Sequence, residues 1–120
     1  MDSIKLSESE SRMMNVIWDR GQVPAARLAE ICEDLYSWKR PTVYTMIGRM
    51  EKKGYLVFES KIVKPLIQRE QVNRSEGAQL LHKGFGDSLP DLFASFLRDR
   101  KLTKDEATRL QKMIEEATEK

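Results

Sequence analysis

The sequence feature that most constrains the fold is the stretch KRPTVYTMIGRMEKKG, which spans residues 39–54. Val43, Ile47 and Met50 recur in it at the spacing of one helical face, so we expect a helix whose apolar stripe packs on a core. Gly54 suits the end of this helix because glycine readily adopts a left-handed conformation. The remaining face of the helix is polar and basic.

That polar face is suited to a DNA groove. Hydroxyl groups near the start of a helix can reach base edges or phosphates, Arg can pair with guanine or phosphate, and Lys neutralises backbone charge. The ordinary alternative is an amphipathic surface helix whose basic side binds nothing. The side chains that we predict to contact DNA are Lys39, Arg40, Pro41, Thr42, Tyr44, Thr45, Arg49, Lys52 and Lys53.

The net charge of +2 is distributed unevenly along the chain. Residues 1–35 hold four basic and seven acidic side chains, a net of −3, whereas residues 36–64 hold seven basic and two acidic ones, a net of +5. Positive charge concentrated on one segment is typical of a phosphate-binding face. A module that binds protein instead of DNA is an alternative, but it would have no need of this charge.

Two further helices are expected before this one. Ser7 and Glu10 have the spacing of a capping box, and Gly21 marks the end of the first helix. The next helix is expected to open at Val23–Pro24, with the proline in its first turn, and to run to about Tyr36. Its apolar side is expected to hold Leu28, Ala29, Ile31, Cys32 and Leu35. Two consecutive short helices of this kind form a helix-turn-helix, whose second helix lies in the major groove.

A β-hairpin is expected directly after the third helix. Tyr55–Glu59 is rich in β-forming residues, Ser60–Lys64 can form a turn, and Leu66–Arg69 can return as the second strand. A hairpin in this place is the wing of a winged helix. Lys61 and Lys64 at its expected tip are candidates for phosphate or minor-groove contacts, although a hairpin end that only faces solvent would carry similar residues.

From Asn73 onward the chain is expected to form three amphipathic helices, with breaks at Gly84–Ser88 and Arg100–Thr103. Their apolar faces lack a sufficient partner within the chain, so we expect a second copy of the chain to cover them. The residues expected at this dimer interface are Leu80, Leu81, Phe85, Leu89, Leu92, Phe93, Phe96, Leu97, Leu110, Met113 and Ile114.

The predicted fold is therefore mainly α with a small β wing (α+β). A winged helix-turn-helix DNA-binding domain is expected at residues 1–72, followed by a helical dimerisation region at residues 73–120. The inventory of reactive groups argues against an enzyme, because His82 and Cys32 are the only residues of their kinds and no Gly-rich phosphate loop is present. No metal or cofactor is expected, and Cys32 is expected to be a buried core thiol. The chain has no signal peptide pattern and no apolar run that could insert into a membrane, so a cytoplasmic location is expected.

Three segments of the sequence together resemble the penicillinase and methicillin-resistance repressors, which are winged-helix dimers of bacteria. They are LSESESRMMNVIWDRG, TVYTMIGRMEKKGYL and FGDSLPDLFASFLRDRKLTKDEATRLQKMIEE, and they occur in the family's order across nearly the full length. The resemblance implies a repressor of a small resistance or stress operon that binds palindromic operators as a homodimer.

The resemblance also implies release from DNA by proteolysis, with a signal-activated membrane metalloprotease as a partner. In this family the cut falls between Asn and Phe, and the matching positions here are Ser95 and Phe96, so Ser replaces Asn. Release by a small-molecule ligand is the alternative that the sequence leaves open.

The sequence departs from the family pattern in three places. Ser11 stands where these repressors commonly carry an aromatic residue. The expected wing lacks the usual glycine at its tip and the usual aromatic residues in its return strand. The C-terminus lacks the cysteine cluster of the copper-responsive branch, so copper sensing is not expected.

Overall fold

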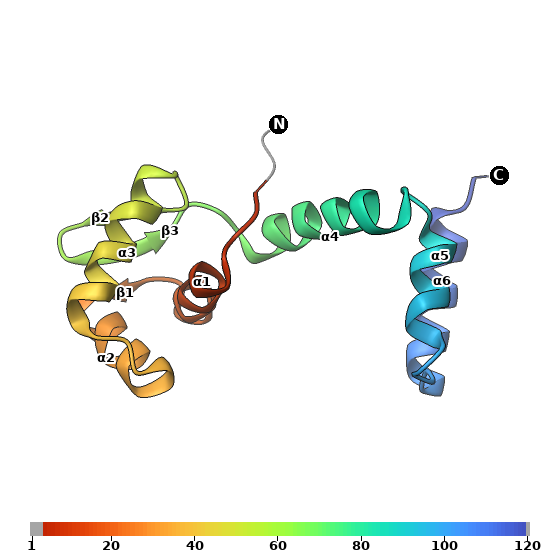
Figure 1. The fold of residues 1–120 in the computed structure, drawn as a ribbon, viewed down its shortest axis with the longest axis horizontal. Coiled ribbons are helices and arrows are strands. Elements are labelled where there is room, and N and C mark those ends of the chain that lie inside the picture. Colours follow the sequence, from red (N-terminus) through yellow and green to blue (C-terminus); the bar gives the residue numbers. More distant parts are fainter. Residues whose placement is uncertain (1–3, 120) are drawn as a thin grey trace. The chain divides into compact units, whose positions relative to one another are not determined.

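The computed structural model describes residues 4–119. Figure 1 shows the order of elements in this range, α1–β1–α2–α3–β2–β3–α4–α5–α6. The helices are α1 (Glu8–Arg20), α2 (Ala25–Tyr36), α3 (Arg40–Lys52), α4 (Arg69–Phe85), α5 (Leu89–Leu97) and α6 (Lys104–Ala117). The strands are β1 (Val23–Pro24), β2 (Leu56–Glu59) and β3 (Ile62–Pro65). The predicted fold class, mainly helical with a small β wing, is confirmed.

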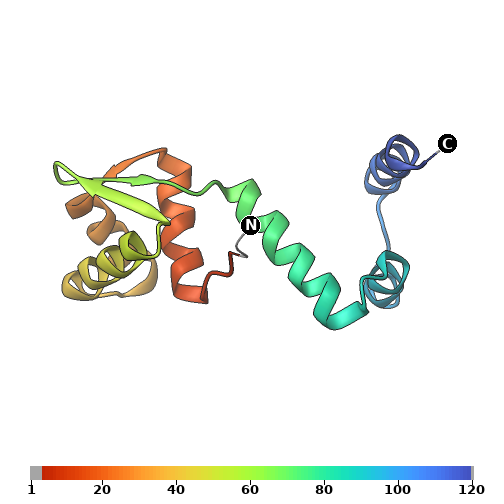
Figure 2. The same cartoon turned by 90° about the horizontal axis from the view of Figure 1, so that it is seen from above.

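The chain divides into two compact units, Met1–Gly77 and Ala78–Lys120. The first holds α1, α2, α3 and a three-stranded antiparallel sheet in the order β1–β3–β2. Within this unit α3 packs beside β2 and α1 beside β3, an arrangement that can be followed in Figure 2. The three helices and the sheet enclose one apolar core.

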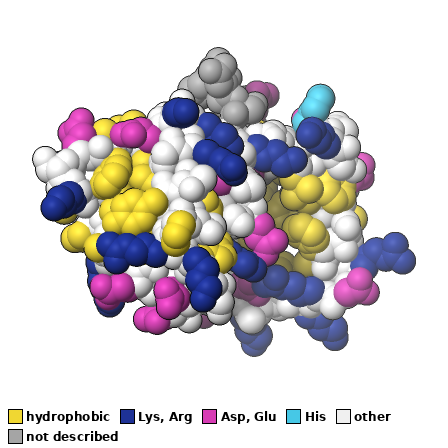
Figure 3. Space-filling view, turned by 60° about the vertical axis from the view of Figure 1, so that its left-hand side comes forward, with side chains coloured by type: hydrophobic (Ala, Val, Ile, Leu, Met, Phe, Trp, Pro, Cys, Tyr) yellow, Lys and Arg dark blue, Asp and Glu magenta, His cyan; other side chains and the backbone are white. Residues whose placement is uncertain are grey.

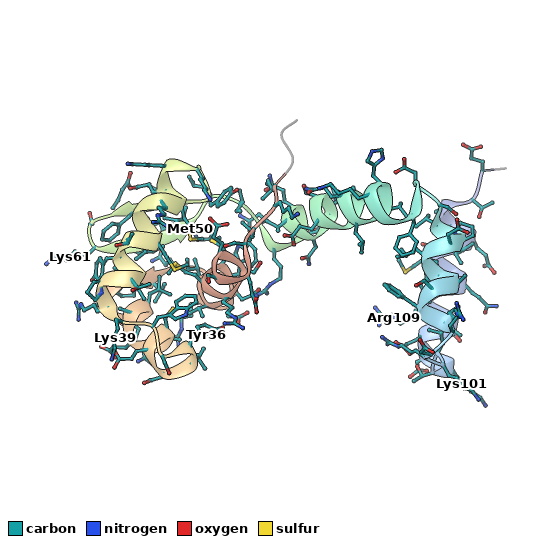
Figure 4. The ribbon with its side chains drawn as sticks, in the orientation of Figure 1. Tyr36, Lys39, Met50, Lys61, Lys101 and Arg109 are labelled. Carbon is teal, nitrogen blue, oxygen red and sulfur yellow. The ribbon has the colours of Figure 1, made fainter. Side chains whose placement is uncertain are left out.

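The core of the first unit is filled by the apolar stripes of its elements. The completely buried large side chains are Met13, Met14, Ile17, Val23, Leu28, Cys32, Val43, Ile47, Met50, Leu56 and Val63. The predicted stripe of α3 is thereby confirmed, and Met50 points from α3 into the unit in Figure 4. Leu35 is an exception, because it was predicted on the apolar side of α2 but is 61% exposed.

Both ends of α1 follow the sequence prediction. The Ser7 hydroxyl accepts a hydrogen bond from the backbone N–H of Glu10 at 3.1 Å, and the Glu10 carboxylate accepts one from the backbone N–H of Ser7 at 2.8 Å. These two bonds make the predicted capping box. Gly21 ends the helix with a φ of 78°, which costs glycine little.

Val23 and Pro24 do not open a helix, and that prediction is wrong. They form β1, in which Val23 faces Val63 and Pro24 faces Ile62 of β3. Helix α2 therefore begins at Ala25, whose backbone N–H donates to the carbonyl oxygen of Lys61 at 2.9 Å. A proline in an edge strand loses no ladder hydrogen bond on its solvent side. The chemistry of Pro24 is therefore compatible with an edge strand as well as with the first turn of a helix.

The hairpin is present, but its turn is shorter and earlier than predicted. The turn consists of Ser60 and Lys61, which have φ values of 51° and 66°. Positive φ at both central residues is typical of a two-residue hairpin turn whose backbone twist matches the twist of the flanking strands. The return strand is consequently Ile62–Pro65 and not Leu66–Arg69. Lys64 thus lies inside β3, away from the tip.

Helix α4 begins at Arg69 and not at Asn73, so it starts four positions before the predicted helix. Its first turns belong to the first unit, where Ser75 accepts a hydrogen bond from the backbone N–H of Ile4 at 2.8 Å. The predicted breaks after α4 and α5 are confirmed, and Thr103 and Glu106 form a capping box at the start of α6.

Candidate nucleic-acid interface

The outward face of α3 is open along its whole length. Lys39 is the N-cap residue of this helix and has an extended backbone, and Pro41 lies in the first turn. The side chains on this face that are exposed are Lys39, Arg40, Pro41, Thr42, Thr45, Arg49, Lys52 and Lys53. Among the predicted contact residues of this helix, Tyr44 differs from the others because its side chain is half-buried and not exposed.

Most cations of this face have no acidic partner. Within residues 4–119, no carboxylate forms an ion pair with Lys39, Arg40, Arg49 or Lys52, nor with Lys61 or Lys64 of the hairpin. Unpaired surface cations keep their full charge for an external anion. Figure 3, with this end of the first unit turned forward, shows Lys and Arg side chains bordering a patch of hydrophobic side chains.

Lys53 differs from the other cations because it has an internal partner. Its Nζ lies 2.7 Å from Oε2 of Glu10, a residue that is only 8% exposed. The other carboxylate oxygen of Glu10 accepts the capping-box hydrogen bond of α1. Glu10 therefore joins the start of α1 to the end of α3, and Lys53 holds α3 in place. The predicted role of Lys53 as a free phosphate contact does not take this ion pair into account.

The environment of Glu10 favours its ionised form. Burial raises the pKa of this carboxyl, but hydrogen bonds from the Lys53 ammonium and from the Ser7 backbone N–H lower it by more. The pKa therefore lies below its ordinary value of 4.5. The same ion pair raises the pKa of Lys53, so both groups are charged at neutral pH.

Thr45 has only part of its hydrogen-bonding capacity available. Its hydroxyl donates to the backbone carbonyl of Pro41, one turn earlier, at 2.9 Å. The hydroxyl proton is thus used within the helix, while the oxygen lone pairs face outward. Thr45 is suited to accept a hydrogen bond from an external donor, such as the amino group of a base.

The hairpin is fixed to α3 and to the start of α2. Oε2 of Glu51 accepts a hydrogen bond from the backbone N–H of Phe58 in β2 at 2.9 Å. The ring of Phe58 meets the ring of Tyr44 edge to face, with centroids 6.4 Å apart. At the tip, the carbonyl of Lys61 is bound to Ala25. The wing therefore has a defined position beside α3.

The structure separates the two lysines that were predicted at the tip. Lys61 lies in the turn, and Figure 4 shows it and Lys39 at the outer edge of the first unit. Lys64 instead borders a hollow of about 520 Å³, next to Trp18, Pro65 and Arg69. Only Lys61 is at the end of the hairpin.

Sequence reasoning missed three side chains that position the predicted contact residues. Glu10 was recognised as a helix cap, but its second oxygen binds Lys53. Glu51 and Phe58 carried no signal beyond charge and β propensity, because their partners come together only when the hairpin folds against α3.

The second unit presents an apolar groove between α5 and α6. The groove has a volume of about 530 Å³ and is lined mainly by Leu89, Phe93, Leu97, Leu110 and Ile114. Of the residues predicted at a dimer interface, those largely exposed in the single chain are Leu80, Leu89, Phe96, Leu97, Met113 and Ile114. Leu81, Phe85, Leu92, Phe93 and Leu110 are half-buried.

Neither a cluster of metal-ligating side chains nor a membrane-spanning helix occurs among the described residues. No group of three or more metal-ligating side chains comes together within residues 4–119. Each helix in that range is too short or too polar to span a lipid bilayer. Cys32 is buried, and burial raises the pKa of its thiol to about 11.

The family of this chain can be recognised over nearly its whole length. Residues 6–116 match the family described as penicillinase repressor. The chain belongs to that family. The match covers the first unit, with its helix-turn-helix and hairpin, and both helices that flank the apolar groove of the second.

Two relatives match this penicillinase repressor family member over nearly its full length at modest identity. The methicillin resistance regulatory protein MecI of Staphylococcus aureus is 23% identical over 114 residues, which is 92% of this chain and 93% of that protein. The penicillinase repressor of Bacillus licheniformis is 22% identical over 116 residues, 93% of this chain and 91% of that one. An uncharacterized 16.5 kDa protein of Latilactobacillus sakei is 33% identical over 57 residues, but this match spans only 48% of this chain and 39% of that protein. The predicted family is confirmed, and the chain is a transcriptional repressor of that family.

Proposed function

We propose that this repressor binds a palindromic operator of a resistance or stress operon as a homodimer, with α3 of each protomer in a major groove of double-stranded DNA. DNA binding is assigned to residues 1–72 and dimerisation to residues 73–120. No enzymatic step is part of this function.

The observation that carries the proposal is the exposed face of α3 with its unpaired cations. Arg40, Arg49 and Lys52 project from a helix whose opposite face is fully buried, so the helix is held rigidly while its charged side stays open. Lys61 adds a cation at the tip of a hairpin fixed beside the same helix. A rigid basic helix with a flanking hairpin fits a major groove and its bordering phosphates.

Dimerisation through the second unit is supported by its unfilled apolar groove. A groove of about 530 Å³ lined by leucine, phenylalanine and isoleucine side chains exposes apolar surface that a monomer rarely leaves open. Each large apolar side chain buried by a second copy would contribute roughly 1.5–3 kcal/mol before the costs of association. Linking two half-site contacts through the dimer would raise operator affinity by roughly 10²–10⁴-fold.

Release is proposed to occur by cleavage of the bond between Ser95 and Phe96 by a signal-activated membrane metalloprotease. Both residues lie in α5, and Phe96 is 55% exposed in the single chain. A cut at this bond would remove α6 from the rest of the chain and open the dimer. A small-molecule ligand that fills the apolar groove is the alternative mode of release.

The test of DNA binding uses a duplex selected by the purified protein from a random-sequence library, with binding measured by fluorescence anisotropy at several salt concentrations. Arg49→Ala should weaken binding to this duplex and to unrelated DNA alike. It should also lower the salt slope by roughly one unit per protomer, because one phosphate contact is lost in each.

Arg20→Ala is the matched control. Arg20 lies in the last turn of α1, as Arg49 lies in the last turn of α3, and it too has no ion pair among the described residues. It should leave both affinity and salt slope unchanged. Selection of no duplex, or an equal effect of the two substitutions, would contradict the proposal and favour a winged-helix module that binds protein.

The mode of release is tested by following the size of the protein in its source organism during induction. Proteolytic release predicts two fragments that join at Ser95–Phe96, and Phe96→Asp should block their formation. Derepression with the chain still at 120 residues would exclude cleavage and favour a ligand.

A further inference from the structure

Arg40 occupies an electrostatically unfavourable place in α3. It is the first residue of the helix, where the free backbone N–H groups carry partial positive charge. A guanidinium at this end is disfavoured by the helix dipole, and no carboxylate within residues 4–119 forms an ion pair with it. No ion pair among the described residues therefore fixes the conformation of Arg40.

Tyr44 contacts Arg40 instead. The guanidinium carbon of Arg40 lies 5.5 Å from the centroid of the Tyr44 ring. A cation at this distance is attracted by the negative face of an aromatic ring. Residues four positions apart lie on the same side of a helix, so the backbone of α3 itself brings the two side chains together.

The tyrosine hydroxyl contributes less than the ring. Nη2 of Arg40 donates to the hydroxyl oxygen of Tyr44 at 3.4 Å, which is long for a hydrogen bond between these atoms. The ring contact is the stronger link between the two side chains. Most N–H groups of the exposed guanidinium remain available to a phosphate or to a guanine.

Tyr44 is itself held by the hairpin. Its half-buried ring meets the Phe58 ring edge to face at a centroid distance of 6.4 Å, with the ring planes 65° apart. The backbone of Phe58 is in turn bound to Glu51 of α3. The contacts run from the wing through Tyr44 to Arg40, so the hairpin determines where this cation lies at the start of α3.

We propose that Tyr44 acts in DNA recognition as a positioning residue, whose ring holds the Arg40 guanidinium in place for the operator, and that Tyr44 does not itself contact base edges. This inference rests on the proposed DNA-binding function. It assigns specificity at this end of the helix to Arg40, and it gives the wing strand a role in specificity that needs no contact between Phe58 and DNA.

A double-mutant cycle tests the proposal. The proteins are the wild type, Tyr44→Leu, Arg40→Ala and the combination of the two, and the probe is the duplex selected by the wild type from a random library. Tyr44→Leu should weaken binding roughly 2–5-fold per protomer, the range that a cation–π contact supplies. With Arg40→Ala already present, Tyr44→Leu should cause almost no further loss. Tyr44→Phe should bind nearly as the wild type does, because it keeps the ring.

Two results would overturn the proposal. One is an equal loss from Tyr44→Leu in both backgrounds, which would mean that Tyr44 contacts DNA independently of Arg40. The other is a loss from Tyr44→Phe as large as that from Tyr44→Leu, which would identify the hydroxyl as the group that matters. Circular dichroism checks that each variant is folded, and Tyr44→Gln replaces Tyr44→Leu should the latter not fold.

A measurement on the protein without DNA tests the positioning role of Tyr44 separately from the proposed DNA-binding function. In the free protein, the side-chain NMR signals of Arg40 should be displaced by the aromatic ring in the wild type and in Tyr44→Phe, and should shift to ordinary positions in Tyr44→Leu. Unshifted Arg40 signals in the wild type would overturn the positioning role even where DNA binding is intact. Shifted Arg40 signals in a protein that selects no duplex would support the contact between Arg40 and Tyr44. They would contradict only the proposed DNA-binding function.

Discussion

The ion pair between Glu10 and Lys53 predicts a specific loss of stability. In Glu10→Gln the amide oxygen can still accept the Ser7 capping bond, but the negative charge that faces the Lys53 ammonium is lost. The Ser7 bond changes from one with a charged acceptor, which contributes roughly 1.5–3 kcal/mol, to one with a neutral acceptor, which contributes roughly 0.5–1.5 kcal/mol. Together with the lost contact to Lys53, the substitution should lower the free energy of unfolding by at least about 1 kcal/mol. Glu10→Ala removes the capping bond as well, and its cost should be about 2–3 kcal/mol.

Thermal unfolding followed by circular dichroism measures these losses. For a unit of this size, 1 kcal/mol corresponds to a change in melting temperature of roughly 4–8 °C. The control is Glu8→Gln, two residues earlier in the same helix, which removes an ion pair with Arg12 whose two side chains are 79% and 46% exposed. Surface pairs of this kind contribute roughly 0.3–0.5 kcal/mol, so Glu8→Gln should hardly change the melting temperature.

The pH dependence supplies an independent check. Because the pKa of Glu10 is lowered in the folded protein, the stabilisation by its charge is fully present above the ordinary value of 4.5 and is lost as the pH falls through the folded pKa. The difference between wild type and Glu10→Gln should therefore be constant near neutral pH and should close in acid. Equal melting temperatures of Glu10→Gln and Glu8→Gln at neutral pH, or a difference that persists in acid, would refute the reasoning.

Three other predictions follow from separate parts of the molecule. The thiol of Cys32, with its pKa raised to about 11 by burial, should resist alkylation at neutral pH and react once denaturant unfolds the chain, as mass spectrometry would show. The double substitution Ser60→Asn, Lys61→Gly should raise the free energy of unfolding by roughly 0.5–1 kcal/mol, because both positions have positive φ; a lower melting temperature would contradict it. A chain that ends at Gly77 keeps the contacts of α4 with the N-terminus, so it should fold and be monomeric in light scattering, and a stable dimer would refute dimerisation through the second unit.

Local features of this fold could be predicted from the sequence. The apolar spacing in α3 and the capping box of α1 involve residues within a few positions of one another, and the structure has them as expected. Strand β1 could not be predicted in this way, because two residues carry no period and their partners Ile62 and Val63 are distant in sequence. The hairpin turn was misplaced for a related reason, since Ser60 and Lys61 lack the Asn-Gly signature that usually marks positive φ.

In the candidate site, too, features set by neighbouring residues could be predicted, whereas contacts between segments distant in sequence could not. The open side of α3 follows from helical spacing, so most of its exposed cations were identified correctly as surface residues. The internal partner of Lys53 and the packing of Tyr44 on Phe58 depend on how α1 and the hairpin fold against α3. A charge count cannot distinguish a cation that holds the scaffold from one that is free to bind a phosphate.

The pairing of β1 with β3 also bears on how the first unit folds. Val23 and Val63 face each other, although all of α2, α3 and β2 lie between them in the chain. Closing the β2–β3 hairpin costs little chain entropy, whereas β1 can join the sheet only after α2 and α3 have folded back, because closing so long a loop costs much more. The wing and the helix-turn-helix should therefore be gained and lost in a single cooperative transition, and a nascent chain should acquire neither until β3 has been synthesised.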